Sequence, residues 1–265
     1  MDIRLLGPLA ARINDRSVVP SAAKPRQVLA LLALHARQVV PVSTLIDEIW
    51  ADRPPRSMTT TLQTYVRQLR RLIETALTTD DRGRTARDVL ATEYGGYSLQ
   101  VEPEEIDVPA FEQLAGAGRA AYDRGDDRTA ATMLNRALSL WRGPALANLP
   151  LGRVLELEVM SLEESRMGAL ERRIEVDLRL GRHVELLGEL SRLVAQHPMH
   201  ENLRALYMTS LYRSGHSARA LEAYQRLRTV LIEELGIEPA PRVQRLQQAI
   251  LVGDPALDQP EHAFG

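Results

Sequence analysis

Residues 107–251 carry helical periodicity throughout and contain no convincing strand. Three short turns interrupt the periodic runs, and each turn begins at a glycine, at Gly125, Gly181 and Gly215. Apolar residues that recur only at helical spacing can be buried only where helices pack on one another. The second part of the chain is therefore predicted to be all-α.

The turns also repeat at a recognisable interval. Gly181 and Gly215 are 34 residues apart, which is the period of tetratricopeptide repeats, while a longer helix at 151–180 accounts for the wider spacing after Gly125. Small and large apolar residues stand five, nine and twelve positions after the glycines: Ala130, Leu134 and Ala137; Leu186, Leu190 and Leu193; Ala220, Tyr224 and Leu227. We predict a tetratricopeptide-like domain at 107–252 and a disordered tail at 253–265.

The stretch 56–75 is predicted to be one helix with two different faces, begun by Ser57 as N-cap. Its apolar residues recur at steps of three and four: Met58, Leu62, Tyr65, Val66, Leu69, Leu72 and Ile73. The opposite side carries hydroxyl, amide and guanidinium groups, which can hydrogen-bond phosphates and the base edges of the major groove. Taken alone, this polar face is equally consistent with a solvated surface.

The neighbouring segments give this helix a context. Short strands are expected within 2–20, helices at 24–37 and 43–50, and a hairpin over 88–101 whose turn is 93–96. Strands, three helices and a terminal hairpin describe a winged helix-turn-helix, in which the third helix enters the major groove. The fold class predicted is thus mainly α, with an N-terminal winged helix-turn-helix at 1–102, a small β-sheet and a wing, followed by the helical domain.

Charge separates the two parts of the chain. The net charge is −2 overall, but residues 1–100 hold 14 basic against 10 acidic residues, and residues 101–265 hold 19 against 25. The first part, at +4, is the better nucleic-acid candidate, and the second, at −6, the better protein-contact candidate. There are no cysteines, no apolar run long enough to span a bilayer and no signal-peptide pattern. We expect a cytoplasmic, nucleoid-associated protein that has no membrane partner.

Several motifs together resemble known families. Leu45–Trp50, Leu62–Leu72 and Gly95–Tyr97 resemble the OmpR-type DNA-binding domain of response regulators. Leu5–Pro8 and Val39–Val42 narrow the resemblance to the Streptomyces antibiotic regulatory protein (SARP) family. The later motifs are similar to the bacterial transcriptional activator domain; they are Leu140–Leu146, Leu180–His183, Leu211–Gly215, Glu233–Pro239 and Gly253–Leu257.

The resemblance implies roles for individual residues. Base-reading candidates are Gln63, Thr64, Arg67 and Gln68. Phosphate candidates are Thr60, Thr61, Arg70, Arg71 and the indole N–H of Trp50, although a tryptophan that ends an apolar helix is more often a core residue. On the wing, Glu93 and Tyr94 stand where an arginine is common, which leaves the Tyr94 side chain and the backbone N–H groups of Gly95 and Gly96 as phosphate contacts.

The function that the resemblance implies is transcriptional activation of a secondary-metabolite (antibiotic) gene cluster. The implied partners are double-stranded promoter DNA with direct repeats near the −35 element, RNA polymerase holoenzyme, and a second copy of the chain, as a homodimer or a side-by-side pair. We expect no enzyme activity, cofactor or metal, since His197 and His200 read as a surface turn and no phosphate-binding glycine loop precedes Lys24. The alternative is a helical-repeat adaptor or ligand sensor whose winged helix contacts protein.

Overall fold

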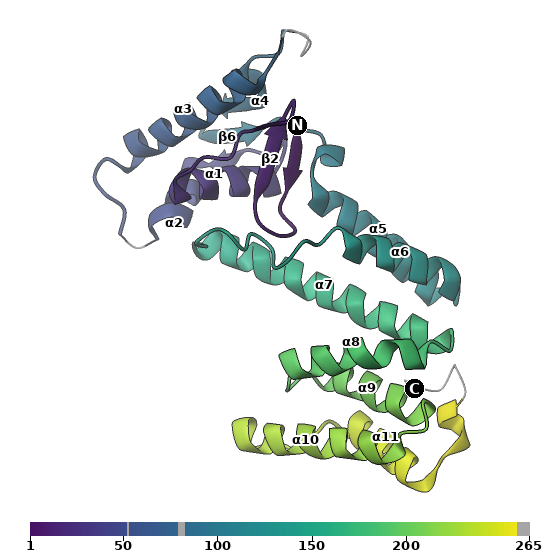
Figure 1. The fold of residues 1–265 in the computed structure, drawn as a ribbon. Coiled ribbons are helices and arrows are strands. Elements are labelled where there is room, and N and C mark those ends of the chain that lie inside the picture. The colour runs from purple at the N-terminus through teal and green to yellow at the C-terminus, as the bar shows by residue number, and fades with distance from the viewer. Residues whose placement is uncertain (52, 79–82, 259–265) are drawn as a thin grey trace. The chain divides into compact units, whose positions relative to one another are not determined.

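The computed structural model describes residues 1–51, 53–78 and 83–258. Its secondary structure is mainly helical, with two small sheets in the N-terminal part (Figure 1). Packing divides the chain into two compact units, each made of two segments: Met1–Gly116 with Arg136–Met167, and Ala117–Asn135 with Gly168–Gly265. The domain boundary predicted near residue 102 lies where one set of sequence motifs ends and the next begins. The two units are instead defined by which residues pack together. In the three described ranges no helix is both long and apolar enough to cross a membrane.

The first unit begins with a three-stranded antiparallel sheet. Its strands are β1 (Asp2–Arg4), β2 (Ala10–Ile13) and β3 (Arg16–Ser17), in the order β1-β2-β3. Asn14 and Asp15 connect β2 to β3, and both have positive φ, at 48° and 61°. Tight hairpin turns of this kind require that conformation at both central residues, and asparagine and aspartate tolerate it better than most other residues.

Three helices follow, α1 (Ala23–Leu34), α2 (Val42–Trp50) and α3 (Met58–Ala76). Helix α3 buries one row of side chains against α1 and α2: Leu62, Val66, Leu69, Ile73 and Ala76. Ser57 immediately precedes α3 as predicted, but its side chain makes no capping hydrogen bond. Helix α2 begins one residue before the predicted cap, Ser43, because Pro41 supplies the extended conformation that precedes its first turn.

The wing belongs to a second antiparallel sheet. Strand β6 (Gly96–Leu99) lies between β4 (Val40–Pro41) and β5 (Leu90–Glu93). The strand expected from residue 88 starts later, because α4 (Ala86–Val89) occupies its first residues. A reciprocal pair of hydrogen bonds between Thr85 and Asp88 begins that helix, and such a capping box satisfies two otherwise unpaired N–H groups.

The first unit also includes parts of α5 (Asp107–Asp123), α6 (Asp127–Ser139) and α7 (Arg153–Arg179). The Asp107 side chain accepts hydrogen bonds from the backbone N–H groups of Leu5 and Leu6, at 2.7 and 3.1 Å. Burial raises the pKa of Asp107 even though these bonds and Arg142 act to lower it.

A buried glutamate joins α2 to the start of α7. The Glu48 side chain is only 2% exposed. Its carboxylate accepts from the backbone N–H groups of Gly152 (2.7 Å), Val154 (3.0 Å) and Leu155 (2.9 Å). The first N–H groups of a helix have no partner inside the helix, and its N-terminus favours negative charge. Glu48 therefore caps α7 from a segment about a hundred residues away in sequence.

The second unit is built of helices. After its portions of α5, α6 and α7 come α8 (His183–Gln196), α9 (Glu201–Arg213), α10 (Ser217–Leu235) and α11 (Pro241–Val252). Helix α9 packs against α8 on one side and α10 on the other (Figure 1). The glycines of the predicted turns have positive φ: Gly125 (74°), Gly181 (78°) and Gly215 (79°). Each is followed five residues later by a buried side chain, and the predicted fold class is confirmed.

The end of the described chain corrects one expectation. Residues from 253 were expected to be disordered, but Pro255–Asp258 forms a 3-10 helix, η3. Leu257 is buried there, and its carbonyl oxygen accepts a hydrogen bond of 2.7 Å from Arg213 on α9. The backbone N–H of Asp254 also donates to the Ala249 carbonyl oxygen at 3.0 Å, so this segment is attached to both α9 and α11. The rest of the predicted tail, 259–265, lies outside the described residues.

Candidate nucleic-acid interface

The exposed side of α3 is the first component of the candidate interface. The predicted residues Thr60, Gln63, Thr64, Arg67 and Arg71 are all exposed, whereas Thr61 and Gln68 are half-buried at its edges. The Thr64 hydroxyl donates to the Thr60 carbonyl oxygen at 3.0 Å, so its lone pairs remain for an outside donor. The structure thus brings the base-reading candidates onto one helix face, with Gln68 the least accessible.

Trp50 lies at the end of α2 and is half-buried. Its ring stacks on that of Tyr65, with centroids 6.2 Å apart and planes 20° apart. Lys24 Nζ lies 5.0 Å from the Trp50 centroid, a distance at which a cation is attracted to an aromatic face. These contacts favour packing as the main role of Trp50. They also place the chain's only lysine beside α3, which sequence reasoning did not foresee.

A groove separates α3 from the wing, and four arginines line it: Arg67, Arg70, Arg71 and Arg87. Arg70 was predicted to contact phosphate, and three of its five guanidinium N–H groups already have partners within the protein. Nε and Nη2 donate to the Leu90 carbonyl oxygen at 2.9 and 2.7 Å, and Nη2 also donates to Thr92 Oγ1 at 2.7 Å. Burial lowers the pKa of Arg70, and the nearby charge of Arg87 acts in the same direction. Arg70 therefore attaches α3 to β5.

Arg87 is the residue that sequence reasoning missed. It is exposed on α4 and adds a guanidinium to the groove. The Glu74 carboxylate accepts from the Ala86 N–H at 3.0 Å, which ties the end of α3 to the start of α4. The Thr85-x-x-Asp88 spacing is a capping-box signature that could have predicted a helix here, and with it the position of Arg87.

The three wing candidates have different surroundings. Tyr94 is fully exposed at the tip of the hairpin, and Gly95 beside it has a φ of 78°. Gly96 is buried between β4 and β5, where a Cβ atom would collide with the Val40 carbonyl oxygen. Packing alone therefore requires glycine at 96, while Tyr94 and Gly95 remain available to a ligand.

The paired histidines of the second unit have structural partners. His200 precedes α9, its Nδ1 accepts from the Leu203 N–H at 3.4 Å, and its Nε2 lies 3.1 Å from the Glu171 carboxylate. Its ring meets that of His197 edge-on, with centroids 6.4 Å apart. Among the residues that the structure describes, no group of three histidine, aspartate or glutamate side chains is placed to hold a metal ion.

An exposed polar helix face, a wing and an arginine-lined groove belong to a winged-helix fold, here combined with an all-α region. Two family models match the chain: "Bacterial transcriptional activator domain" over residues 106–251 and "Transcriptional regulatory protein, C terminal" over residues 16–99. The chain belongs to the SARP family of bacterial transcriptional regulators, as its motifs predicted.

Named relatives support the same family. The chain is 54% identical over 259 residues to regulatory protein DnrI of Streptomyces peucetius, covering 98% of this chain and 95% of DnrI. It is 34% identical to transcriptional regulator RedD of Streptomyces coelicolor, covering 98% of this chain and 73% of RedD. Regulatory protein AfsR of Streptomyces griseus is 36% identical over 97% of this chain, which spans only 25% of AfsR. These homologues are all named as regulators.

A solved structure has the same fold. Mycobacterium tuberculosis EmbR, determined in complex with a low-affinity phosphopeptide, superposes with a TM-score of 0.86 at 33% sequence identity. The match covers 96% of this chain and 65% of the EmbR chain. The tetratricopeptide-like second part and the winged helix predicted from the sequence are therefore both present in a known relative.

Proposed function

We propose that this regulator is a sequence-specific DNA-binding activator of a secondary-metabolite gene cluster. The observation that carries the proposal is the exposed face of α3, where hydroxyl, amide and guanidinium groups lie opposite a fully buried apolar row. A merely solvated helix has no need of a wing beside it or of three arginines with exposed side chains along the intervening groove. Both are expected where α3 enters a major groove and phosphates flank it.

In this proposal the polar residues divide by role. Gln63, Thr64 and Arg67 read base edges from α3, with Gln68 contributing from its half-buried position. Thr60, Thr61, Arg71 and Arg87 contact phosphates, because they lie at the margins of the face or across the groove from it. Tyr94 and the Gly95 N–H contact the backbone beside the major groove. Arg70 acts indirectly by holding the wing against α3.

The family resemblance supports the wider part of the proposal. One recognition helix reads only a few base pairs, so a second copy on a direct repeat doubles the sequence read and the phosphates contacted. We propose that two copies bind side by side near the −35 element and recruit RNA polymerase holoenzyme. The protein would act in the cytoplasm, at the nucleoid.

The test is fluorescence anisotropy with two duplexes, a promoter fragment that carries the direct repeats and a scrambled duplex of equal length. We expect Arg67→Ala to cost about 1–3 kcal/mol on the repeats and much less on the scrambled duplex. Arg71→Ala should weaken binding to both and reduce the slope of log K against log salt by about 0.9. Arg4→Ala is the matched control, because Arg4 is exposed on β1 and bonds only to its neighbour Asp2 in the described part of the chain.

Two outcomes would count against the proposal. Equal loss on both duplexes would make Arg67 a phosphate contact and remove the main base-reading residue. Binding to neither duplex at low salt would favour the alternative, a helical-repeat adaptor or ligand sensor whose winged helix contacts protein.

A further inference from the structure

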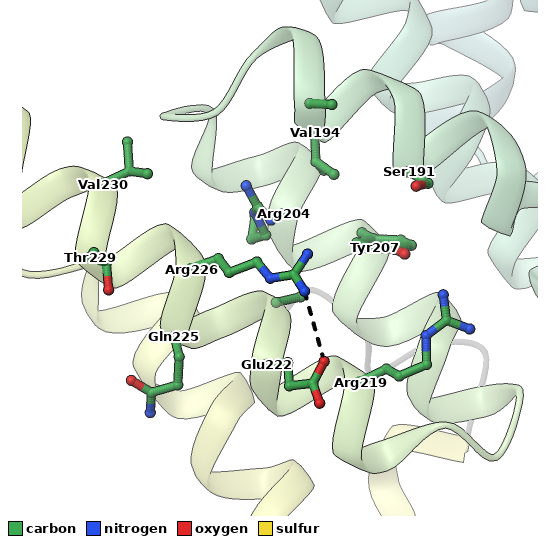
Figure 2. A pocket seen from close by; sticks show the side chains of 12 residues that line it. Ser191, Val194, Arg204, Tyr207, Arg219, Glu222, Gln225, Arg226, Thr229 and Val230 are labelled. Carbon is green, nitrogen blue, oxygen red and sulfur yellow. Dashed lines mark ion pairs between the residues drawn. The ribbon is translucent and has the colours of Figure 1, made fainter.

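The second unit contains a pocket of about 720 Å³ between α8, α9 and α10. Figure 2 shows arginines from two helices directed into it, Arg204 from α9 with Arg219 and Arg226 from α10. Small-molecule sites commonly have volumes of this order and combine an apolar lining with a few polar groups. None of these residues belongs to the candidate nucleic-acid interface.

Arg204 lies at the base of the pocket and is only 7% exposed. Its Nε has no hydrogen-bond partner among the residues that the structure describes. Its Nη2 makes one long hydrogen bond, of 3.4 Å, to the Pro198 carbonyl oxygen. Burial lowers the pKa of Arg204, and the charge of Arg226 adds to that effect. This cation is thus largely buried, its Nε is shielded from solvent, and it has no anion in exchange.

Another buried arginine of the same unit provides a comparison. Arg173 is also 7% exposed and its Nε is also unpaired, but its guanidinium forms ion pairs with Asp177 and Glu189. Within the described ranges, no carboxylate lies within ion-pair distance of Arg204. The fold therefore neutralises one buried arginine from within and leaves the other, at the base of an open pocket, without a counter-ion.

Exposed side chains at the rim of the pocket add further positive charge. Arg219 and Arg226 are exposed, and the one carboxylate of the lining, Glu222, lies 4.0 Å from Arg226. Three guanidinium groups and a single carboxylate thus line the pocket, although residues 101–265 as a whole carry a net charge of −6. The remaining lining includes the aliphatic side chains of Val194 and Val230.

We propose that this pocket binds a small amphipathic anion, whose carboxylate or phosphate group accepts hydrogen bonds from Arg204, Arg219 and Arg226 while its apolar body lies against Val194 and Val230. Only a small terminal group reaches Arg204, because so little of that side chain is accessible from outside. A bound anion would contact all three helices, so it would stabilise the second unit in proportion to its occupancy. The proposal does not depend on DNA binding.

The experiment measures binding to the intact chain by isothermal titration calorimetry with four probes: 2-naphthoate, 2-naphthyl phosphate, the neutral isostere 2-naphthamide, and pentaglutamate. We expect saturable binding of at least one anionic naphthyl probe, at least tenfold tighter than that of 2-naphthamide. Inorganic phosphate should compete, since it shares the anionic group but not the apolar body.

Variants assign the binding to the pocket. Arg204→Gln should lower the affinity for the anionic probe at least tenfold without changing the affinity for 2-naphthamide. Arg204 is buried, so its replacement can also disturb folding. Arg219→Gln and Arg226→Gln, which change exposed residues, are therefore measured as well, and each should lower the affinity for the anionic probe several-fold. Arg245→Gln is the control, since Arg245 is exposed on α11 and does not line the pocket.

Three results would overturn the proposal. The first is equal affinity for anionic and neutral naphthyl probes, or no binding of either anionic probe. The second is binding that none of the three pocket variants weakens more than Arg245→Gln does. The third is tighter binding of pentaglutamate than of the naphthyl anions, lost in the same variants, which would make the pocket a docking surface for an acidic protein segment.

Discussion

Replacing Glu48 tests how α2, which precedes α3, is attached to α7. Its carboxylate is the shared acceptor for three backbone N–H groups at the start of α7, and it also accepts from Gln27 Nε2 at 3.2 Å. Glu48→Ala leaves all three N–H groups buried or half-buried without this partner. It also removes the negative charge that faces the positive end of the helix.

The magnitude follows from those groups. Each stranded buried donor costs about 1–3 kcal/mol, which gives a range of about 3–9 kcal/mol for three donors. Water that enters the space of the missing side chain recovers part of this cost, and loss of one partner from a buried charged network typically costs about 3–5 kcal/mol. We expect Glu48→Ala to lower the free energy of unfolding of the first unit by about 3–5 kcal/mol. Glu48→Gln should cost about half as much, because one oxygen still accepts.

The assay is urea denaturation followed by tryptophan fluorescence. The chain has two tryptophans, Trp50 and Trp141, and both lie in the first unit, so the signal reports on that unit alone. Glu164→Ala is the control, because Glu164 is exposed on α7 and its removal should change stability by less than about 0.5 kcal/mol. A loss below about 1 kcal/mol for Glu48→Ala would refute the inference that this carboxylate holds α2 and α7 together.

Three further predictions concern the wing and its supports. Arg70→Gln should weaken binding to repeat and scrambled duplexes alike, by about 1–2 kcal/mol, with an unchanged slope of log K against log salt, because the wing loses its attachment to α3. In the anisotropy assay, a loss on the repeats alone would make Arg70 a base contact, and a reduced salt slope would make it a phosphate contact. Gly96→Ala should destabilise the first unit by about 1–3 kcal/mol, because the added methyl group displaces the Val40 carbonyl, and unaltered urea denaturation would contradict this. The backbone and side-chain hydrogen bonds of Thr85 lower the pKa of Asp88, so the cap is complete above the ordinary aspartate pKa and is lost as pH falls through the lower, folded-state value. The protection factor of the Thr85 amide, whose N–H donates to the Asp88 carboxylate at 2.7 Å, should therefore fall in acid, and Asp88→Asn should remove that pH dependence.

Helix α3 could be predicted from the sequence because the information that defines it is local. Leu62, Val66, Leu69 and Ile73 repeat at a spacing that only a helix converts into one buried row, and all four are buried in α3. The wing could be predicted equally well, since its glycines mark a tight turn between two strand-like runs. Both elements depend on neighbours in sequence, so periodicity and turn chemistry suffice to define them.

The partners of single polar residues could not be predicted in the same way. An arginine on a polar face fits a phosphate and a backbone carbonyl equally well, and only the folded wing shows that Arg70 bonds to Leu90. The role of Glu48 depends on N–H groups at residues 152–155, which no local pattern connects to it. The sequence did carry a weak signal that Glu48 is buried and needs a partner, because this residue lies on the apolar side of α2 with Leu45 and Ile49.

The packing also explains why the motif boundary near residue 102 does not coincide with the edge of a compact unit. Asp107 accepts from the N–H groups of Leu5 and Leu6, and Asn148 Oδ1 accepts from the Leu9 N–H at 2.7 Å. These donors lie in the loop between β1 and β2, where the first sheet offers them no partner. Together with the Glu48 cap, these bonds make segments around 107 and 148–155 part of the structure that supports the winged helix. The motifs thus mark the stretches whose sequences resemble known families. The hydrogen bonds mark the residues that must be present together for α3 to be held in place.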